Sequence, residues 1–237
     1  MSREDFEKIY TNKAAQRPCL DGKVNIKFRQ NNGDTIQLKS VGNYQLPSDI
    51  ELDGLQNQVR QIEIDSLTDE LRKIKKQYSI SRGILSPSQR IEHLKLEMQF
   101  AKDRLENEDS YHLYEELGHK LQFTIFNNGD FTLQKTTVLI EIEPYDGLHI
   151  SETKIHSPSG KINDVWYPVV NKLKNGGYAI TANPSEIKHK LPHELLRRPL
   201  RFFFDNNLKG KTINLKITLH AENYHDTLIF MKHIEIV

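Results

Sequence analysis

GKTINLKITLHAEN, residues 210–223, is the stretch of sequence that decides the fold class. Within it, Ile213, Leu215, Ile217 and Leu219 alternate with polar residues. Successive side chains of a strand point to opposite faces, so this spacing predicts a β-strand with one face buried. One-sided alternation is typical of antiparallel sheets, because strands of a parallel α/β sheet are apolar on both faces.

The same alternation recurs on both sides of this stretch. Further apolar-polar runs occupy residues 121–125, 138–142, 200–204 and 228–236, with glycines and prolines between them. Seven or so short strands separated by turn residues favour an antiparallel β-sandwich. The sequence therefore predicts a C-terminal sandwich over residues 118–237.

The tetrapeptide Asn-Asn-Gly-Asp occurs twice, at residues 31–34 and 127–130. The first copy separates two short alternating runs, and its Asn-Gly pair suits a tight turn with positive φ. We therefore expect a β-hairpin in an N-terminal unit, residues 1–47, that also contains a short helix at residues 2–15. The second copy is predicted to be a turn, in which Asn and Gly supply positive φ and Asp130 binds local backbone amides.

Residues 48–117 have a helical pattern instead. Ser48 to Glu51 has the form of a capping box, and apolar residues then recur every three or four positions. An offset after Ile62 predicts a bend or break near Asp65. A second start at Ser86 precedes a regular seam. That seam consists of Ile91, Leu94, Met98, Ala101 and Leu105. The segment is thus predicted to be an antiparallel, coiled-coil-like helical hairpin, and the whole chain an α+β protein.

Composition narrows the functional classes. The 237 residues carry a net charge of +1, which gives no global field toward nucleic acid or anionic membranes. A single cysteine, Cys19, leaves no internal disulfide. No run approaches the roughly 18 apolar residues needed to span a bilayer, and the N-terminus lacks an apolar signal core. We expect a soluble, cytoplasmic protein without membrane contact.

The sequence contains no catalytic signature. There is no G-x-S-x-G elbow, no phosphate-binding G-x-x-x-x-G-K-S/T loop and no H-E-x-x-H metal motif. His189, His193 and Glu194 are the best local ligand set, but Pro192 spoils the helical spacing that would direct both rings to one ion. We therefore predict no catalytic residue, no cofactor and no metal site, and a hydrolase built on these three residues is the least favoured hypothesis.

Two sets of residues are candidates for contact with partners. The first set lies out of phase with buried neighbours on predicted strands and would anchor a protein partner. It comprises Phe203, Arg201, Leu139 and Ile229. The second set is basic and would contact nucleic-acid phosphates. It comprises Arg197, Arg198, Lys188 and Lys190, with Arg72, Lys73, Lys75 and Lys76 on the first long helix.

The C-terminal half resembles two known groups of proteins. Its first part is similar to the Ig-like modules of many bacterial proteins. The residues that carry this similarity are Asn127, Gly129, Val138, Ile140, Ile142, Pro144, Gly147 and Leu148. LPHELLRRPLRFFF, residues 191–204, together with residues 210–223, resembles the C-terminal accessory sandwich of bacterial proteins with an Alba-type DNA-binding domain. The resemblance implies an accessory role beside an effector protein. The chain has no Alba-type domain, so nucleic-acid activity does not follow from it.

These observations support two main hypotheses of different classes. In the first, the chain is a non-enzymatic interaction or assembly module whose helical hairpin projects from the sandwich and mediates self-association or docking to a protein partner. In the alternative, it is a nucleic-acid-associated accessory subunit of a bacterial regulatory or defence system that uses the basic residues.

Overall fold

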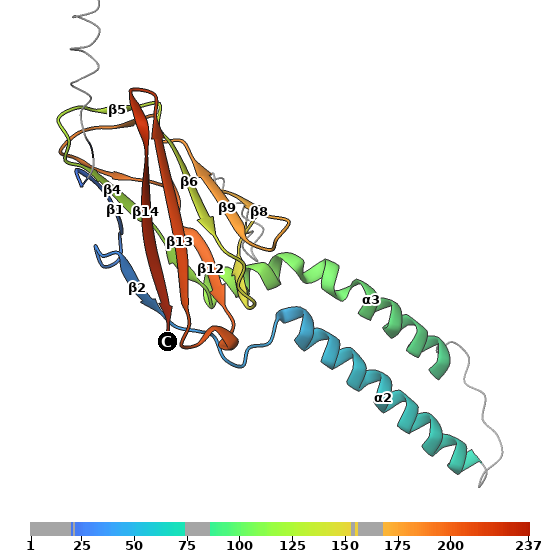
Figure 1. The fold of residues 1–237 in the computed structure, drawn as a ribbon. Helices are drawn as coiled ribbons and strands as arrows, with labels where there is room; N and C mark the ends of the chain where they lie inside the picture. The colour runs from blue at the N-terminus through green and yellow to red at the C-terminus, as the bar shows by residue number, and fades with distance from the viewer. Residues whose placement is uncertain (1–19, 21, 74–85, 153–154, 156–167) are drawn as a thin grey trace, which may run out of the picture.

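The computed structural model describes residues 20, 22–73, 86–152, 155 and 168–237, with the backbone alone for residues 70–73. The helix predicted at residues 2–15 and Cys19 lie outside these ranges. Within them the protein is α+β, as predicted. Two helices, α2 (Pro47–Lys73) and α3 (Pro87–Tyr111), run side by side away from one end of a β-sandwich (Figure 1). No helix in the described part of the chain is long and apolar enough to cross a membrane.

One layer of the sandwich is a six-stranded sheet. Its strands, in spatial order, are β2 (Thr35–Leu38), β14 (Tyr224–Ile236), β13 (Thr212–Ala221), β6 (Thr137–Ile142), β9 (Tyr178–Ala182) and β8 (Val169–Lys172). All neighbours in it are antiparallel except β2, which runs parallel to β14.

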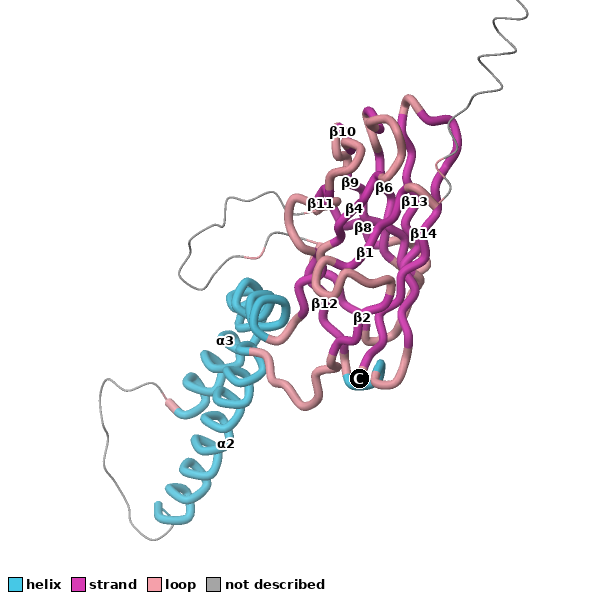
Figure 2. The backbone as a smooth tube through the Cα atoms, turned by 90° about the vertical axis from the view of Figure 1, so that its left-hand side faces the viewer, coloured by secondary structure: helices cyan, strands magenta, loops and turns pink. Residues whose placement is uncertain are grey.

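The second layer is divided into two three-stranded antiparallel sheets. One has the order β1 (Val24–Phe28), β4 (Phe123–Asn127), β11 (Pro192–Glu194). The other has the order β3 (His119–Leu121), β12 (Leu200–Phe204), β7 (Leu148–Ile150). A short pair, β5 (Leu133–Gln134) with β10 (Glu186–Ile187), lies at the end of the sandwich away from the helices, and a 3-10 helix, Asn206–Leu208, joins β12 to β13 (Figure 2). The Ig-like form of the sandwich stays a prediction.

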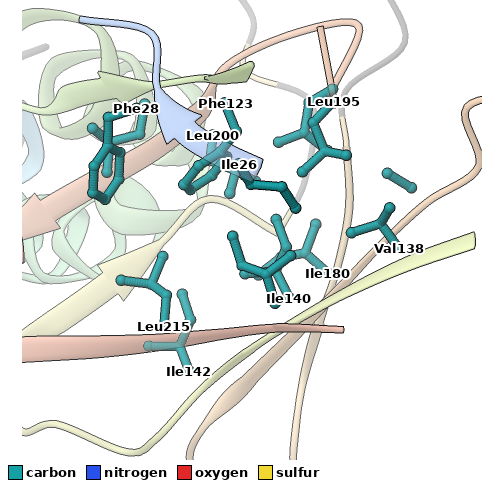
Figure 3. Packing of buried hydrophobic residues seen from close by; sticks show 14 of the residues in the cluster. Ile26, Phe28, Phe123, Val138, Ile140, Ile142, Ile180, Leu195, Leu200 and Leu215 are labelled. Atoms are coloured by element: carbon teal, nitrogen blue, oxygen red, sulfur yellow. The ribbon is translucent and has the colours of Figure 1, made fainter. Parts of the chain in front are cut away.

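The core lies between the two layers. Ile26, Phe28 and Phe123 of one layer join Ile140, Ile180 and Leu215 of the other in a single cluster (Figure 3). The four alternating residues of the stretch at 210–223 are all fully buried there. Each such side chain contributes roughly 1.5–3 kcal/mol on burial, so this alternation fixes which face of β13 is inside.

The predicted N-terminal hairpin is wrong, because β1 and β2 do not pair with each other. Ile26 of β1 lies opposite Ile125 of β4, whereas Ile36 of β2 lies opposite Ile234 of β14. The tight turn itself exists, with Asn32 at φ +54°. After that turn the chain passes from one layer to the other, because each strand buries its apolar residues by completing a sheet made of later strands.

The second Asn-Asn-Gly-Asp copy is held by Asn127 rather than by Asp130. The buried Asn127 side chain donates to the carbonyls of Phe131 and Ile187 and accepts the Gly129 amide at 3.0 Å. Asp130 instead forms an ion pair with Lys23 at 3.3 Å. In both copies the first Asn side chain accepts the Gly amide at 3.0 Å, but positive φ is found at Asn32 and not at its counterpart Asn128, so the two turns agree only in part.

Helix α2 is continuous through Asp65, so of the bend or break predicted there the break is wrong, and the bend stays a prediction. The side-chain amide of Gln61 donates to the Asp65 carboxylate across one helical turn at 2.9 Å. The predicted capping box at Ser48 is also absent, because Pro47 occupies the first helical position and the Ser48 amide donates to Asp109 of α3 at 2.9 Å.

The start of α3 confirms its prediction. The Ser86 hydroxyl accepts the Gln89 amide, and the Gln89 side chain accepts the Ser86 amide. The two helices are antiparallel (Figure 1), and Glu51 near the start of α2 forms an ion pair with Arg104 near the end of α3. After α3 the chain continues through a π-helix, His112–Glu116, into β3.

Candidate interaction surface

Two of the four predicted partner-binding residues, Leu139 and Ile229, lie in one row on the outer face of the six-stranded sheet. Thr218 of β13 is directly opposite Ile229 of β14 on one side and Leu139 of β6 on the other. From Leu139 the row continues to Thr181 of β9 and then to Val169 of β8. The pairing register therefore brings five residues from distant parts of the sequence into one line, which we call the outer row.

The outer row faces away from the core. Ile229 is 58% exposed and Val169 is 62% exposed, while Leu139 and Thr218 are half-buried by their neighbours. Figure 1 shows α2 and α3 leaving the sandwich at its end, so neither helix crosses this face. No element in the described part of the chain covers Ile229 or Val169.

Polar side chains flank much of the outer row, and the exposed Met231 lies opposite Lys216 in the row beside it. Two residues further along β13 and β6, on the same face, Lys216 and Glu141 form an ion pair at 3.3 Å. On the other side, Thr227 of β14 and His220 of β13 share a hydrogen bond of 3.1 Å. An apolar centre with a polar surround is the usual anatomy of a protein-binding surface.

The size of this face suits a modest interface. Five strands spaced by about 4.8 Å span about 20 Å, and the ten residues of β13 span about 33 Å. The resulting area, roughly 600 Å², is somewhat below the roughly 800 Å² per partner of a standard stable complex.

Phe203 is not part of any exposed surface, contrary to the prediction. Its side chain points away from the core, yet it is 0% exposed. The segment between β2 and α2 crosses over β12, so the Tyr44 ring meets the Phe203 ring edge-on at 4.9 Å. His149 packs on Phe203 from the other side, and both Tyr44 and His149 contact Asp205 at 3.3 Å. Burial, with Asp205 nearby, raises the pKa of Tyr44.

Arg201, also predicted to contact a partner, instead contacts another residue of the same chain. Its side chain is 10% exposed and forms an ion pair with Glu115 of the π-helix, which Lys120 also contacts at 2.5 Å. Although burial acts to raise the pKa of Glu115, hydrogen bonds from Lys120 and Arg201 hold it below its ordinary value. Arg201 therefore attaches the end of the helical hairpin to the sandwich.

The predicted nucleic-acid residues do not form one surface. Lys188 and Lys190 lie in the turn before β11, and Arg197 and Arg198 follow its other end, all of them exposed. Arg72 and Lys73 lie in the last turn of α2, far from β11 (Figure 2). Lys75 and Lys76 lie outside the described residues.

The three residues considered for a metal site each contact different residues of the protein. His193 accepts the Lys188 amide at 2.9 Å, while Glu194 binds Arg29 and Gln122. His189 contacts Thr132 at 3.5 Å. Across the ranges that the structure describes, no group of three or more His, Cys, Asp or Glu side chains is arranged to hold a metal ion.

Three members of the outer row, Thr218, Thr181 and Val169, were not predicted. Thr218 had the same signal as Leu139, since it lies between the buried Ile217 and Leu219. What the sequence lacked was the register, because only strand pairing shows that these positions are neighbours.

Comparison with known proteins assigns no family. No family model matches the sequence, and no curated protein matches it. A chain of the CaDoc0917–CaCohA2 complex is 15% identical, with a TM-score of 0.33 over 51% of this chain and 89% of that chain. The solution structure of CaCohA2 from Clostridium acetobutylicum is 14% identical, with a TM-score of 0.33 over 51% and 81%. AvmM, which catalyses macrocyclization in alchivemycin A biosynthesis, is 7% identical, with a TM-score of 0.25 over 50% and 80%. Similarity at this level carries neither a family nor a function to this protein.

Proposed function

We propose that this chain is a non-enzymatic protein-interaction module that binds a folded partner protein through the outer face of its six-stranded sheet. The observation that carries the proposal is the outer row, an in-register line of Ile229, Thr218, Leu139, Thr181 and Val169. Polar side chains and the exposed Met231 lie beside it. Along this line the apolar Ile229, Leu139 and Val169 alternate with Thr218 and Thr181, each of which carries a methyl group. Extended apolar surfaces mark interaction sites, whereas single exposed residues do not.

The chemistry of the row favours binding without rearrangement. Four of its five residues are β-branched, so their side chains have little rotamer freedom to lose when a partner covers them. The strands beneath are fixed by the buried core, including Ile217 and Ile140 directly beside the row. A flat, rigid face of roughly 600 Å² suits a partner with a flat apolar surface and an association that can dissociate.

Native purification of the untagged chain and of two variants tests this function. The double variant Ile229→Lys, Val169→Lys places two charges in the row and should abolish co-purification of the partner. Leu191→Lys is the matched control, because Leu191 is similarly exposed at 52% but lies beside β11 in the other layer. Retention of the partner by the double variant would contradict the proposal, and a dimer lost only in the double variant would identify the partner as a second copy.

The finer parts of the function rest on the sequence resemblance. An accessory role beside an effector protein, in the cytoplasm of a bacterium, stays a prediction. So does the nucleic-acid alternative, for which Lys188, Lys190, Arg197 and Arg198 are exposed. A mobility shift at low salt that is lost on charge reversal of these four residues would support the alternative, and the absence of any shift would remove it.

A further inference from the structure

The helical hairpin has a groove on one of its sides, which we call the Met98 groove. It has a volume of about 280 Å³ and is lined by Gln56, Val59 and Arg60 of α2 and by Lys95 and Met98 of α3. Val59 and Met98 are half-buried, whereas Arg60 and Lys95 are exposed. The groove therefore has an apolar floor between two cationic side chains, one from each helix.

The hairpin closes its own seam only near the sandwich. There Leu55 of α2 and Ala101 of α3 are buried, and the Glu51–Arg104 ion pair joins the helices. Further along, the seam residues Val59, Ile62, Leu94 and Met98 are only half-buried. Two helices alone cannot enclose an apolar seam, so a third helix placed along the groove would bury what they leave open.

Charge distinguishes this groove from the opposite side of the hairpin. Neither Arg60 nor Lys95 forms an ion pair with any residue that the structure describes, although Arg104 on the same hairpin does. The cleft on the other side is lined by Asp65, Asp69 and Arg90, so charges of both signs meet there. A ligand for the Met98 groove must therefore satisfy an apolar floor and two positive charges at once.

We propose that the Met98 groove binds an amphipathic helix of a partner protein whose apolar stripe is flanked by carboxylates. The apolar stripe contacts Val59 and Met98, and the unbranched Met98 side chain adapts to the shape of the residue it meets. Carboxylates on the two flanks of the stripe pair with Arg60 and Lys95, which sets the face that the helix turns toward the groove. This site is separate from the outer row, so the two proposals stand or fall independently.

Fluorescence anisotropy of the full chain with two dye-labelled synthetic peptides tests the proposal. Each peptide has about 21 residues with leucine at the core positions of a heptad repeat, and glutamate or lysine at the flanking positions. The glutamate peptide should bind about tenfold more tightly than the lysine peptide, and the preference should shrink between about 50 and 500 mM salt.

Charge reversal in the Met98 groove is the decisive part of the peptide-binding experiment. Arg60→Glu with Lys95→Glu should invert the peptide preference, which loss of folding cannot do. Arg90→Glu is the matched control, because it makes the same charge change on α3 but lines the opposite cleft, and it should keep the preference of the unmodified chain. Equal binding of both peptides, or an equal effect of the control, would overturn the proposal. A dimer of the chain that dissociates only in the double variant would overturn it as well, because the occupant would then be a second hairpin.

Discussion

The outer side of β12 and the outer side of the six-stranded sheet carry the same sequence signal and have opposite environments. Phe203 and Ile229 are both large apolar residues out of phase with buried neighbours, yet Phe203 is 0% exposed and Ile229 is 58% exposed. The difference is the segment that leads from β2 to α2, which lays Tyr44 over Phe203. Alternation along a strand thus predicts where a side chain points, but what lies beyond it depends on another part of the chain.

The largest loss of stability is expected from truncating Phe203, the residue that Tyr44 covers. Phe203→Ala should lower the free energy of unfolding by about 3–5 kcal/mol, because it leaves a cavity between β12, Tyr44 and His149. Chemical denaturation measures this value. Phe100→Ala, at a residue that is 61% exposed on α3, is the control and should change stability by no more than about 0.5 kcal/mol. Equal effects of the two variants would contradict the assigned burial of Phe203.

Truncating Tyr44, which covers Phe203, should lower the free energy of unfolding less than truncating Phe203 itself. Tyr44→Ala should lower the free energy of unfolding by about 2 kcal/mol, because it exposes the Phe203 ring and removes the hydrogen bond to Asp205. Tyr44→Phe keeps the ring and should cost about 0.5–1 kcal/mol. Unfolding curves of both variants check the order, and an unchanged stability of Tyr44→Ala would show that the segment does not hold Phe203 in place.

The junction between the hairpin and the sandwich should respond to pH. Glu115→Gln should cost about 1 kcal/mol at neutral pH, because it removes the charge that Arg201 and Lys120 contact. Since the folded chain lowers the pKa of Glu115, the ionised carboxylate stabilises the fold above the ordinary value of 4.5. That stabilisation is lost as the pH falls through the lowered pKa of the folded state. The stability difference between the unmodified chain and Glu115→Gln should therefore shrink on acidification; a constant difference would exclude this role.

The smallest effect on the free energy of unfolding is expected for a substitution in the outer row. Ile229→Ala should change the free energy of unfolding by no more than about 0.5 kcal/mol, because Ile229 has no covering element in the described chain. The same denaturation experiment measures it beside Phe203→Ala. A loss of more than about 2 kcal/mol would show that the outer face of β14 is covered, which would remove the basis of the proposed binding surface.

Local patterns predicted much of the secondary structure correctly. Ile213, Leu215, Ile217 and Leu219 alternate with polar residues and are buried, and α3 starts after Ser86 as predicted, where Ser86 and Gln89 form a capping box. These features depend on neighbours within a few positions, so the sequence displays them directly.

Features that depend on distant segments were missed. The Asn-Asn-Gly-Asp turn at residues 31–34 was real, but the strands beside it pair with β4 and β14, which no local pattern shows. The same limit applies to the candidate site. Leu139 and Ile229 were predicted from alternation, whereas their link through Thr218 required the register of three strands.

Site-specific photo-crosslinking at position 229 shows whether the outer row binds a protein partner. A photo-crosslinking amino acid replaces Ile229 in one variant and Leu191 in another, since both side chains are about half exposed but lie in different layers. We expect a discrete crosslinked complex with one protein at position 229 and none at position 191. Absence of a crosslinked protein at position 229, or the same products at both positions, would contradict partner binding by the outer row.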